Sequence, residues 1–247
     1  DVDFDVIEGN INGLVGANGA GKSTLLKIIA GALRPDCGEL KLDGRALALT
    51  SINDAARAGI AIVSQELSLF PALSVEENLL LAPGGRSWKA RRAFARRAYA
   101  ILEKLGVHVA LGTPLHRLSL ADRQLVEIAR ALLQNPRVLI LDEPTSSLHI
   151  AEVERLHSII RDLRHSGIGI VYVSHFLEEL LEISDNLVIL RNGRRVPEHI
   201  APAVDQLKVV VAAMLGETPE SVAERAHRLD DRSAAAVSYT HLTLPTI

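Results

Sequence analysis

The sequence predicts an α/β fold in which a sheet of parallel strands carries an inserted helical subdomain. Short β-branched runs recur along the chain, and six of them are predicted to be strands: Val2–Ile7, Ile11–Val15, Ile60–Val63, Val138–Leu141, Ile168–Val173 and Leu187–Leu190. Apolar residues spaced three or four apart predict helices between several of these runs, over Lys22–Ala30, Val153–Leu163 and Phe176–Leu181. Alternation of strand and helix favours a parallel sheet.

The segment from about residue 71 to residue 135 differs from the rest of the chain. It contains no clear strand pattern and is predicted to be helical, including the long basic stretch Ser87–Leu105. An all-helical insert within an α/β core is the simplest organisation. We therefore expect one domain over residues 1–216, with the helical insert at about 71–135.

Composition and charge indicate a globular protein with no nucleic-acid partner. Of the 247 residues, 48% are apolar and 23% are charged, and the formal net charge is −3, which gives no general attraction to nucleic acid. The single cysteine, Cys37, can form no disulfide within the chain, as is compatible with a reducing cytosol. The longest apolar run, Val209–Leu215, is far shorter than the roughly 18 residues of a membrane span. A role at a membrane is therefore expected to come through a partner protein.

The end of the chain is expected to lie outside the domain. Residues 217–235 include the charged stretch Glu224–Arg232 and are predicted to be a linker. Residues 236–247 lack periodicity and resemble the in-frame translation of a sequencing adapter, so they are left out of the fold argument. An ordinary disordered tail is the alternative.

A glycine-rich motif follows the predicted strand Ile11–Val15. Residues 16–24 read Gly-Ala-Asn-Gly-Ala-Gly-Lys-Ser-Thr and fit the pattern G-x-x-x-x-G-K-[ST]. Its glycines let backbone N–H groups point at phosphate oxygens, and the following helix N-terminus adds partial positive charge. Lys22 is expected to reach the β- and γ-phosphates, and Ser23 to offer a hydroxyl to Mg²⁺. The predicted nucleotide-binding residues here are Gly16, Asn18, Gly19, Ala20, Gly21, Lys22, Ser23 and Thr24.

A second motif is an apolar strand that ends in two carboxylates. Residues 137–143 read Arg-Val-Leu-Ile-Leu-Asp-Glu. Charges at the end of a buried strand are costly unless they meet a metal ion or water. Asp142 is therefore expected to hold Mg²⁺, and Glu143 to accept a proton from the attacking water. The two motifs alone predict a P-loop nucleotide hydrolase that uses Mg²⁺, and they do not identify the nucleotide.

Along nearly the whole domain, the order and spacing of further motifs resemble those of ABC (ATP-binding cassette) ATPases. Gln65 lies in Ser-Gln-Glu after the third predicted strand, and His175 lies in Val-Ser-His after the fifth. The resemblance implies the ABC ATPase core sheet with its helical subdomain. It also implies that Gln65 contacts Mg²⁺ and the attacking water and links to the helical insert. The same resemblance implies that His175 contacts the γ-phosphate and that water.

The segment Leu118–Gln124 occupies the position of the ABC signature. It reads Leu-Ser-Leu-Ala-Asp-Arg-Gln, whereas the family usually has Leu-Ser-Gly-Gly-Gln. The family's serine and backbone N–H groups bind the γ-phosphate held by the opposite domain, which makes Ser119 a candidate nucleotide contact. Ser119 is also placed to cap the following helix, Leu125–Leu133. Signature function and capping alone both remain open for this residue.

Other positions depart from the family pattern. Leu120 and Ala121 replace the signature glycines, and Asp122 replaces the glutamine, which adds negative charge beside a triphosphate. His149 stands where the family usually has an aspartate. The family's adenine-stacking aromatic residue is expected upstream of the first residue, so the chain is expected to be truncated at its start. Phe4 instead alternates with apolar neighbours, as a core strand residue does.

Three segments resemble importers of monosaccharides: residues 65–71, 126–132 and 174–180. Those proteins usually carry two fused cassettes, and the first often lacks the signature glycines. The resemblance implies an N-terminal half in which residues 217–235 are the linker toward a missing second cassette. This half would work with ATP and Mg²⁺ as the ATP-hydrolysing subunit of an importer, peripheral on the cytoplasmic face of the cell membrane. The implied partners are a second cassette, membrane permease subunits that contact the region of Gln65 to Leu81, and, indirectly, a periplasmic or extracellular sugar-binding protein.

Two other function classes remain open. One is a soluble ABC ATPase of translation or DNA repair, against which the lack of basic excess and the importer-like segments argue. The other is a cassette that binds ATP with weak hydrolysis, against which the intact Lys22, Asp142, Glu143 and His175 argue.

Overall fold

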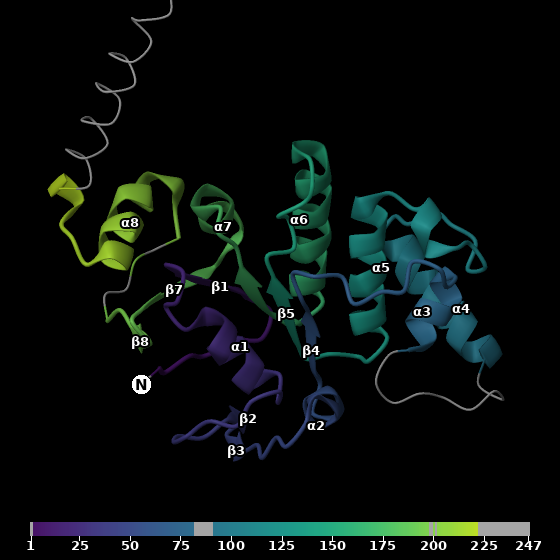
Figure 1. Cartoon of the computed structure of the whole chain (residues 1–247), viewed down its shortest axis with the longest axis horizontal. Helices are drawn as coiled ribbons and strands as arrows, with labels where there is room; N and C mark the ends of the chain where they lie inside the picture. Colours follow the sequence, from purple (N-terminus) through teal and green to yellow (C-terminus); the bar gives the residue numbers. More distant parts are fainter. Residues whose placement is uncertain (1, 82–90, 198–199, 201, 222–247) are drawn as a thin grey trace, which may run out of the picture.

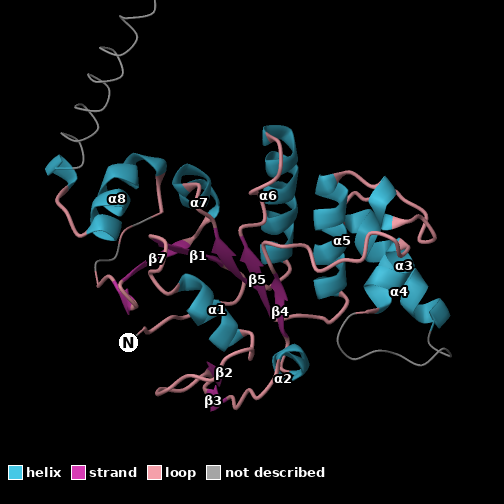
Figure 2. Ribbon diagram, in the orientation of Figure 1, coloured by secondary structure: helices cyan, strands magenta, loops and turns pink. Residues whose placement is uncertain are grey.

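The structure is a computed structural model that describes residues 2–81, 91–197, 200 and 202–221. Its centre is a sheet of six described strands in the order β4-β5-β6-β1-β7-β8 (Figures 1 and 2). The strands are β1 (Ile11–Gly16), β4 (Ile60–Val63), β5 (Val138–Asp142), β6 (Gly169–Val173), β7 (Asn186–Arg191) and β8 (Arg194–Arg195). All neighbours pair in parallel except β7 and β8, so the predicted parallel sheet is confirmed.

Helices cover both faces of this sheet. The described helices are α1 (Lys22–Ile29), α2 (Ile52–Arg57), α3 (Val75–Leu80), α4 (Arg91–Lys104), α5 (Leu120–Leu132), α6 (Ile150–His165), α7 (Leu177–Ile183) and α8 (Leu207–Leu215). Figure 1 shows α1 and α2 on one side of the sheet and α5 to α8 on the other. Strands that are buried on both faces need apolar side chains at successive positions, which explains the continuous β-branched runs in the sequence.

Two apolar cores follow from this layering. On β1, Ile11 and Val15 belong to the core beneath α5, α6 and α7, whereas Leu14 belongs to the core beneath α1. The two sets point to opposite faces because side chains alternate along a strand. The smaller core contains Leu26 and Ile29, the buried residues of α1, and therefore fixes that helix against the sheet.

The described part of residues 71–135 contains helices α3, α4 and α5, a 3₁₀ turn at Leu115–Arg117, connecting loops and one isolated bridge between Ser74 and Pro114, and no described strand lies there. Helix α5 contacts α3, α4 and strand β4, so it joins the helical segment to the sheet. Helix α4 confirms the described part of the expected basic helix, whose first four residues, 87–90, lie outside the described residues. The expected boundaries of the insert stay a prediction.

The expectation of a strand over Val2–Ile7 is wrong. Side chains alternate in burial there as predicted, with Val2, Phe4 and Val6 partly buried against the smaller core. However, no described strand pairs with this backbone. Arg195 instead donates through Nη1 to the Asp3 carbonyl at 3.2 Å. Alternating burial reports which side chains face a core, and it does not report a hydrogen-bonded neighbour.

Several elements were not expected from the sequence. They are helix α2, helix α8, strand β8 and a small antiparallel pair formed by β2 (Lys41–Leu42) and β3 (Arg45–Ala46). Within the described residues, no helix has the length and apolar character needed to cross a bilayer. The expected linker at 217–235 lies mostly outside the described residues, and the segment 236–247 lies there entirely.

Candidate functional site

The strand register places the predicted site residues at one edge of the sheet. Val173 pairs with Leu14 on one side and with Asp142 on the other, and Val63 pairs with Leu141. Parallel strands end at the same edge, which we call the carboxyl edge. Gly16, Gln65, Glu143 and His175 each follow one of these paired positions within two residues. Ligands of open α/β sheets commonly bind at this edge.

The loop of residues 16–21 leaves β1 at the carboxyl edge and needs its glycines. A Cβ on Gly16 would lie 2.4 Å from the Leu190 carbonyl oxygen, which excludes any side chain there. Gly19 and Gly21 have φ values of +78° and +105°, which L-residues rarely adopt. The Ala20 amide donates to the Ala17 carbonyl at 3.0 Å, which closes the turn. Asn18 and Gly19 are exposed at its tip, while Ala20 is buried.

Lys22 curls back over this loop from the first position of α1. Its Nζ donates to the Gly16 carbonyl at 2.6 Å and to the Ala17 carbonyl at 3.2 Å. Ser23 and Thr24 follow in the first turn and are exposed. The helix begins with free N–H groups and no acidic residue in its first turn. A cation, a helix N-terminus and exposed hydroxyls are thus gathered where an anion can bind.

Asp142 ends β5, which β6 separates from β1 in the sheet. Burial raises the pKa of its carboxyl above the usual value, and the Glu143 charge raises it further, whereas the Lys22 charge acts in the opposite direction. A carboxylate held under such unfavourable conditions is typical of a functional site. A bound cation would favour the ionised form of Asp142 and so lower this pKa.

Glu143 follows with an uncommon backbone conformation. Its φ is +50°, and its amide donates to the Val173 carbonyl at 2.9 Å, so the residue after β5 is tied to the end of β6. The Glu143 Oε2 lies 3.1 Å from His175 Nδ1. The side chain of Glu143 is 20% exposed and that of His175 is 51% exposed, so both remain accessible. Strained backbone at an accessible carboxylate is characteristic of active sites.

The donor set fits Mg²⁺. Ser23, Gln65 and Asp142 offer hydroxyl, amide and carboxylate oxygens at the carboxyl edge, and Mg²⁺ prefers oxygen ligands while keeping several waters. Gln65 is exposed directly beyond β4, on the loop that leads to the helical segment. The described residues contain no group of three or more His, Cys, Asp or Glu able to hold a metal. Phosphate and water oxygens would complete the octahedral coordination that Mg²⁺ requires.

Ser119 lies apart from these residues, at the N-terminus of α5. Its Oγ accepts from the Asp122 amide at 3.0 Å, which confirms the expected capping role. The Asp122 carboxylate accepts from Ser119 Oγ at 3.0 Å and lies 3.4 Å from Arg155 Nη1 on α6. Among the described residues, no hydrogen bond joins Ser119 to Lys22 or to the acidic pair. His149 precedes α6 and is exposed.

A buried polar cluster behind the acidic pair was not predicted from the sequence. It consists of Thr145, His157, Tyr172, Ser174 and Glu179, and we call it the Glu179 cluster. One signal was present, namely a tyrosine within an otherwise aliphatic strand, because a buried phenol normally needs a hydrogen-bond partner.

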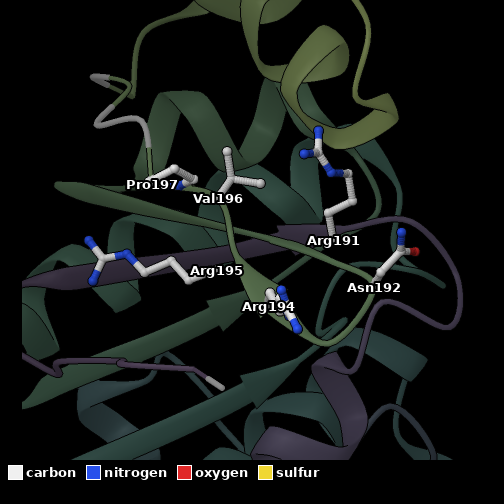
Figure 3. A pocket seen from close by; sticks show the side chains of 6 residues that line it. All are labelled: Arg191, Asn192, Arg194, Arg195, Val196 and Pro197. Carbon is white, nitrogen blue, oxygen red and sulfur yellow. The ribbon is translucent and has the colours of Figure 1, made fainter.

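An open pocket of about 500 Å³ lies along the turn between β7 and β8 (Figure 3). The Gly193 amide in this turn donates to the Ala20 carbonyl at 3.0 Å, so the turn touches the glycine-rich loop. Figure 3 shows the three arginines of the pocket pointing in different directions. Arg191 donates to the Ala213 carbonyl at 2.9 Å, and Arg195 donates to Asp3. The arginines therefore do not converge on a ligand.

Comparison with known proteins is consistent with this geometry. The profile of a family described as "ABC transporter" matches residues 1–146. A ribose import ATP-binding protein of Rubrobacter xylanophilus is 45% identical over 216 residues, which cover 85% of this chain and 41% of that protein. An arabinose import ATP-binding protein of Burkholderia pseudomallei is 43% identical over 217 residues, covering 87% and 43%. The chain thus spans less than half the length of these relatives.

Solved structures share the fold. The ADP conformation of an ATP-binding cassette of an ABC transporter matches with a TM-score of 0.75 and 26% identity, covering 87% of this chain and 91% of that one. A nucleotide-free cassette from an ABC transporter matches with a TM-score of 0.74 and 25% identity, covering 85% and 87%.

Proposed function

This chain belongs to the ABC transporter family, and on that premise we propose that it binds and hydrolyses ATP as one cassette of a monosaccharide importer. The observation that carries the proposal is the gathering of Lys22, Asp142, Glu143 and His175 at the carboxyl edge of one sheet. Relatives named for ribose and arabinose import support the substrate class.

Nucleotide binding would begin at the glycine-rich loop. The triphosphate can replace the two carbonyl oxygens that now accept from Lys22 Nζ, because an anion is a stronger acceptor than a neutral carbonyl. The N–H groups of the loop and of the first turn of α1 then face phosphate oxygens. Bound Mg²⁺ would neutralise phosphate charge, with Ser23, Gln65 and Asp142 as its candidate protein ligands.

Hydrolysis would depend on Glu143 and His175. Glu143 accepts the proton of the attacking water, for which an accessible carboxylate at the site is suited. The contact at 3.1 Å between Glu143 Oε2 and His175 Nδ1 orients the imidazole ring. Nε2 then lies on the opposite edge of the ring, where it can meet a γ-phosphate oxygen and stabilise developing charge. Gln65 would help to place the water.

Ser119 supports the proposal that a second cassette completes the site. Within this chain Ser119 is fixed at the start of α5 by its own cap, apart from Lys22. We infer that Ser119 contacts the nucleotide bound by the opposite cassette. We also infer that the corresponding serine of that cassette contacts the nucleotide bound at Lys22 and Glu143. The relatives' greater length leaves room for such a second cassette in the full protein.

The membrane partner would meet the loop after Gln65 and helix α3. Phe70 is 56% exposed and Leu81 is 51% exposed, so large apolar side chains are available there for a permease. This contact would hold the cassette at the cytoplasmic face of the membrane. The sugar-binding protein would act on the permease from the other side and would not touch this chain.

A cassette that binds ATP with weak hydrolysis is the second candidate function. The observation that favours it is the start of α5, where Leu120, Ala121 and Asp122 stand in place of the family's usual residues. Side chains at these positions limit how closely the backbone can approach a nucleotide held by the opposite cassette, whereas glycine allows a close approach.

Reconstitution of the full-length protein tests the main proposal. We expect it to copurify with a membrane permease and to drive ATP-dependent uptake of labelled ribose or arabinose into proteoliposomes. ATP hydrolysis without a permease partner would support the soluble ATPase. A permease complex that binds ATP but releases no phosphate would support the cassette with weak hydrolysis.

A further inference from the structure

The Glu179 cluster joins four elements behind the acidic pair. Thr145 lies in the loop after β5, His157 lies on α6, Tyr172 and Ser174 lie at the end of β6, and Glu179 lies on α7. The first four are buried, and the side chain of Glu179 is 11% exposed. The elements meet where Glu143 and His175 leave the sheet.

The Glu179 carboxylate accepts hydrogen bonds from several of its neighbours. Thr145 Oγ1 lies 2.9 Å from both carboxylate oxygens, and Ser174 Oγ lies 3.5 Å from Oε2. Tyr172 donates its hydroxyl to Oε1, and His157 Nε2 lies 3.1 Å from the same oxygen. A buried carboxylate is tolerated only when its oxygens are so well satisfied.

The protonation states of Glu179 and Tyr172 agree with these hydrogen bonds. Burial by itself raises the pKa of the Glu179 carboxyl, but the hydrogen bonds from His157, Tyr172 and Thr145 together lower it below its usual value. Burial, and then the nearby Glu179 charge, raise the pKa of the Tyr172 phenol. Tyr172 therefore remains a donor and Glu179 an ionised acceptor at neutral pH.

Two short connections lead from Glu179 to the reacting groups. Thr145 lies two residues after Glu143 in the same turn, in which the Ser146 amide donates to the Glu143 carbonyl at 3.3 Å. Ser174 directly precedes His175, and its Oγ accepts from the Phe176 amide at 3.0 Å. One carboxylate thus holds both chain segments whose side chains meet at 3.1 Å.

We propose that Glu179 is a positioning residue for hydrolysis, because it fixes the Glu143 loop and the His175 strand end relative to each other. The proposal rests on the proposed ATPase function. An apolar side chain could fill the same space and often stabilises a core at least as well as a buried charge. Packing alone therefore does not require a carboxylate with these donors at the junction of four elements.

The test uses the full-length protein assembled with its permease, with the catalytic carboxylate of the second cassette inactivated so that only this site turns over. Thr145→Val removes one hydroxyl at nearly constant volume and cuts the link between Glu179 and the Glu143 loop. We expect kcat to fall by about tenfold to a hundredfold, the range expected when a reacting group shifts by up to about 1 Å. KM for ATP should stay within about twofold, because the nucleotide contacts are unchanged.

Matched variants separate positioning from folding. Thr145→Ser keeps the hydroxyl and should restore kcat, whereas Glu179→Gln should lower it. Glu178→Gln is the control, because Glu178 is an exposed carboxylate one position away on the same helix. In Glu179→Gln/His175→Ala, the loss should be much smaller than the product of the two single losses, since Glu179 acts through His175 and Glu143. Fully multiplicative losses, or equal kcat for Glu179→Gln and Glu178→Gln, would overturn the proposal.

Amide hydrogen exchange gives a readout that does not need turnover. In Thr145→Val, exchange of residues 145–148 and 174–177 should speed up while that of α1 stays unchanged. A parent protein without ATPase activity would refute the proposed function. The exchange result would still decide the role of Glu179, because unchanged exchange in Thr145→Val would refute positioning.

Discussion

At the scale of single residues, the site depends on charges that are held in unusual settings. Lys22 is folded onto loop carbonyls, Asp142 is partly buried beside another carboxylate, and Glu143 has a positive φ. The settings of Asp142 and Glu143 cost folding free energy, which a bound ligand can offset. Replacements at these positions should therefore affect binding and stability differently.

Lys22→Ala should weaken ATP binding by about tenfold to a hundredfold, since a hydrogen bond to a charged group contributes about 1.5–3 kcal/mol. Isothermal titration of the purified protein with Mg-ATP measures this. Lys27→Ala is the matched control, because Lys27 is an exposed lysine later on the same helix. Equal affinities for the two variants would contradict the role of Lys22.

Asp142→Asn should raise the melting temperature of the nucleotide-free protein near pH 7. The pKa of Asp142 is raised in the folded state, so the folded protein holds this proton more tightly than the unfolded chain does. The stability that protonated Asp142 contributes is lost as pH rises through its folded-state pKa, so the ionised carboxylate destabilises the folded protein. The uncharged amide of the asparagine removes this cost. The same variant should lose Mg²⁺-dependent ATP affinity. A lower melting temperature at pH 7 would show that Asp142 stabilises the fold by contacts instead.

The residues of the glycine-rich loop and the acidic pair could be predicted because each motif is local in sequence. The Glu179 cluster could not, because its hydrogen bonds join residues 145 to 179 across α6 and β6, and no spacing rule covers such contacts. The roles of the site residues remain predictions until variants are measured.

At the scale of elements, helix α5 carries the departure from the family pattern. Ser119 caps it, and Asp122 in its first turn pairs with Arg155. A carboxylate at this position is favourable for the helix, because it complements the positive end of the dipole. The replacement that disfavours a bound triphosphate thus stabilises helix α5 of this chain.

Restoring the family's usual residues at the start of α5 should therefore raise ATPase activity and lower the stability of the chain. In the isolated chain, Leu120→Gly with Ala121→Gly and Asp122→Gln should recover part of the ATPase activity through self-pairing. Two glycines in the helix cost about 1–2 kcal/mol, which lowers the melting temperature by about 2–8 °C for a domain of this size. Phosphate release and thermal melting measure both effects. Recovery of no activity in a folded, dimeric variant would show that the replaced residues do not limit self-pairing.

Strands that are buried on both faces could be predicted because their β-branched runs are continuous, and long helices because their apolar spacing is regular. The strand over Val2–Ile7 was predicted wrongly, since alternation revealed burial without a pairing partner. Helix α2 has only six residues and β8 has two, so neither offers enough periods for a sequence pattern.

At the scale of the whole molecule, the proposed function divides each nucleotide site between two cassettes. Because Ser119 lies apart from Lys22, the isolated 247-residue chain should hydrolyse ATP slowly or not at all. Adding the second cassette should raise ATP turnover per site well above that of the isolated chain. Equal turnover for the isolated chain and for its assembly with the second cassette would show that the altered signature does not limit hydrolysis.

The central claim is that ATP is hydrolysed at the carboxyl edge of this sheet with Glu143 as the base. The most direct measurement is phosphate release by the assembled transporter, with the second cassette's own base inactivated, for the parent and for Glu143→Gln. The amide can position water but cannot take its proton, so ATP affinity should be kept while kcat falls by about a hundredfold or more, as expected for loss of a general base. Turnover of Glu143→Gln within about tenfold of the parent, below the usual contribution of such a base, would contradict the account.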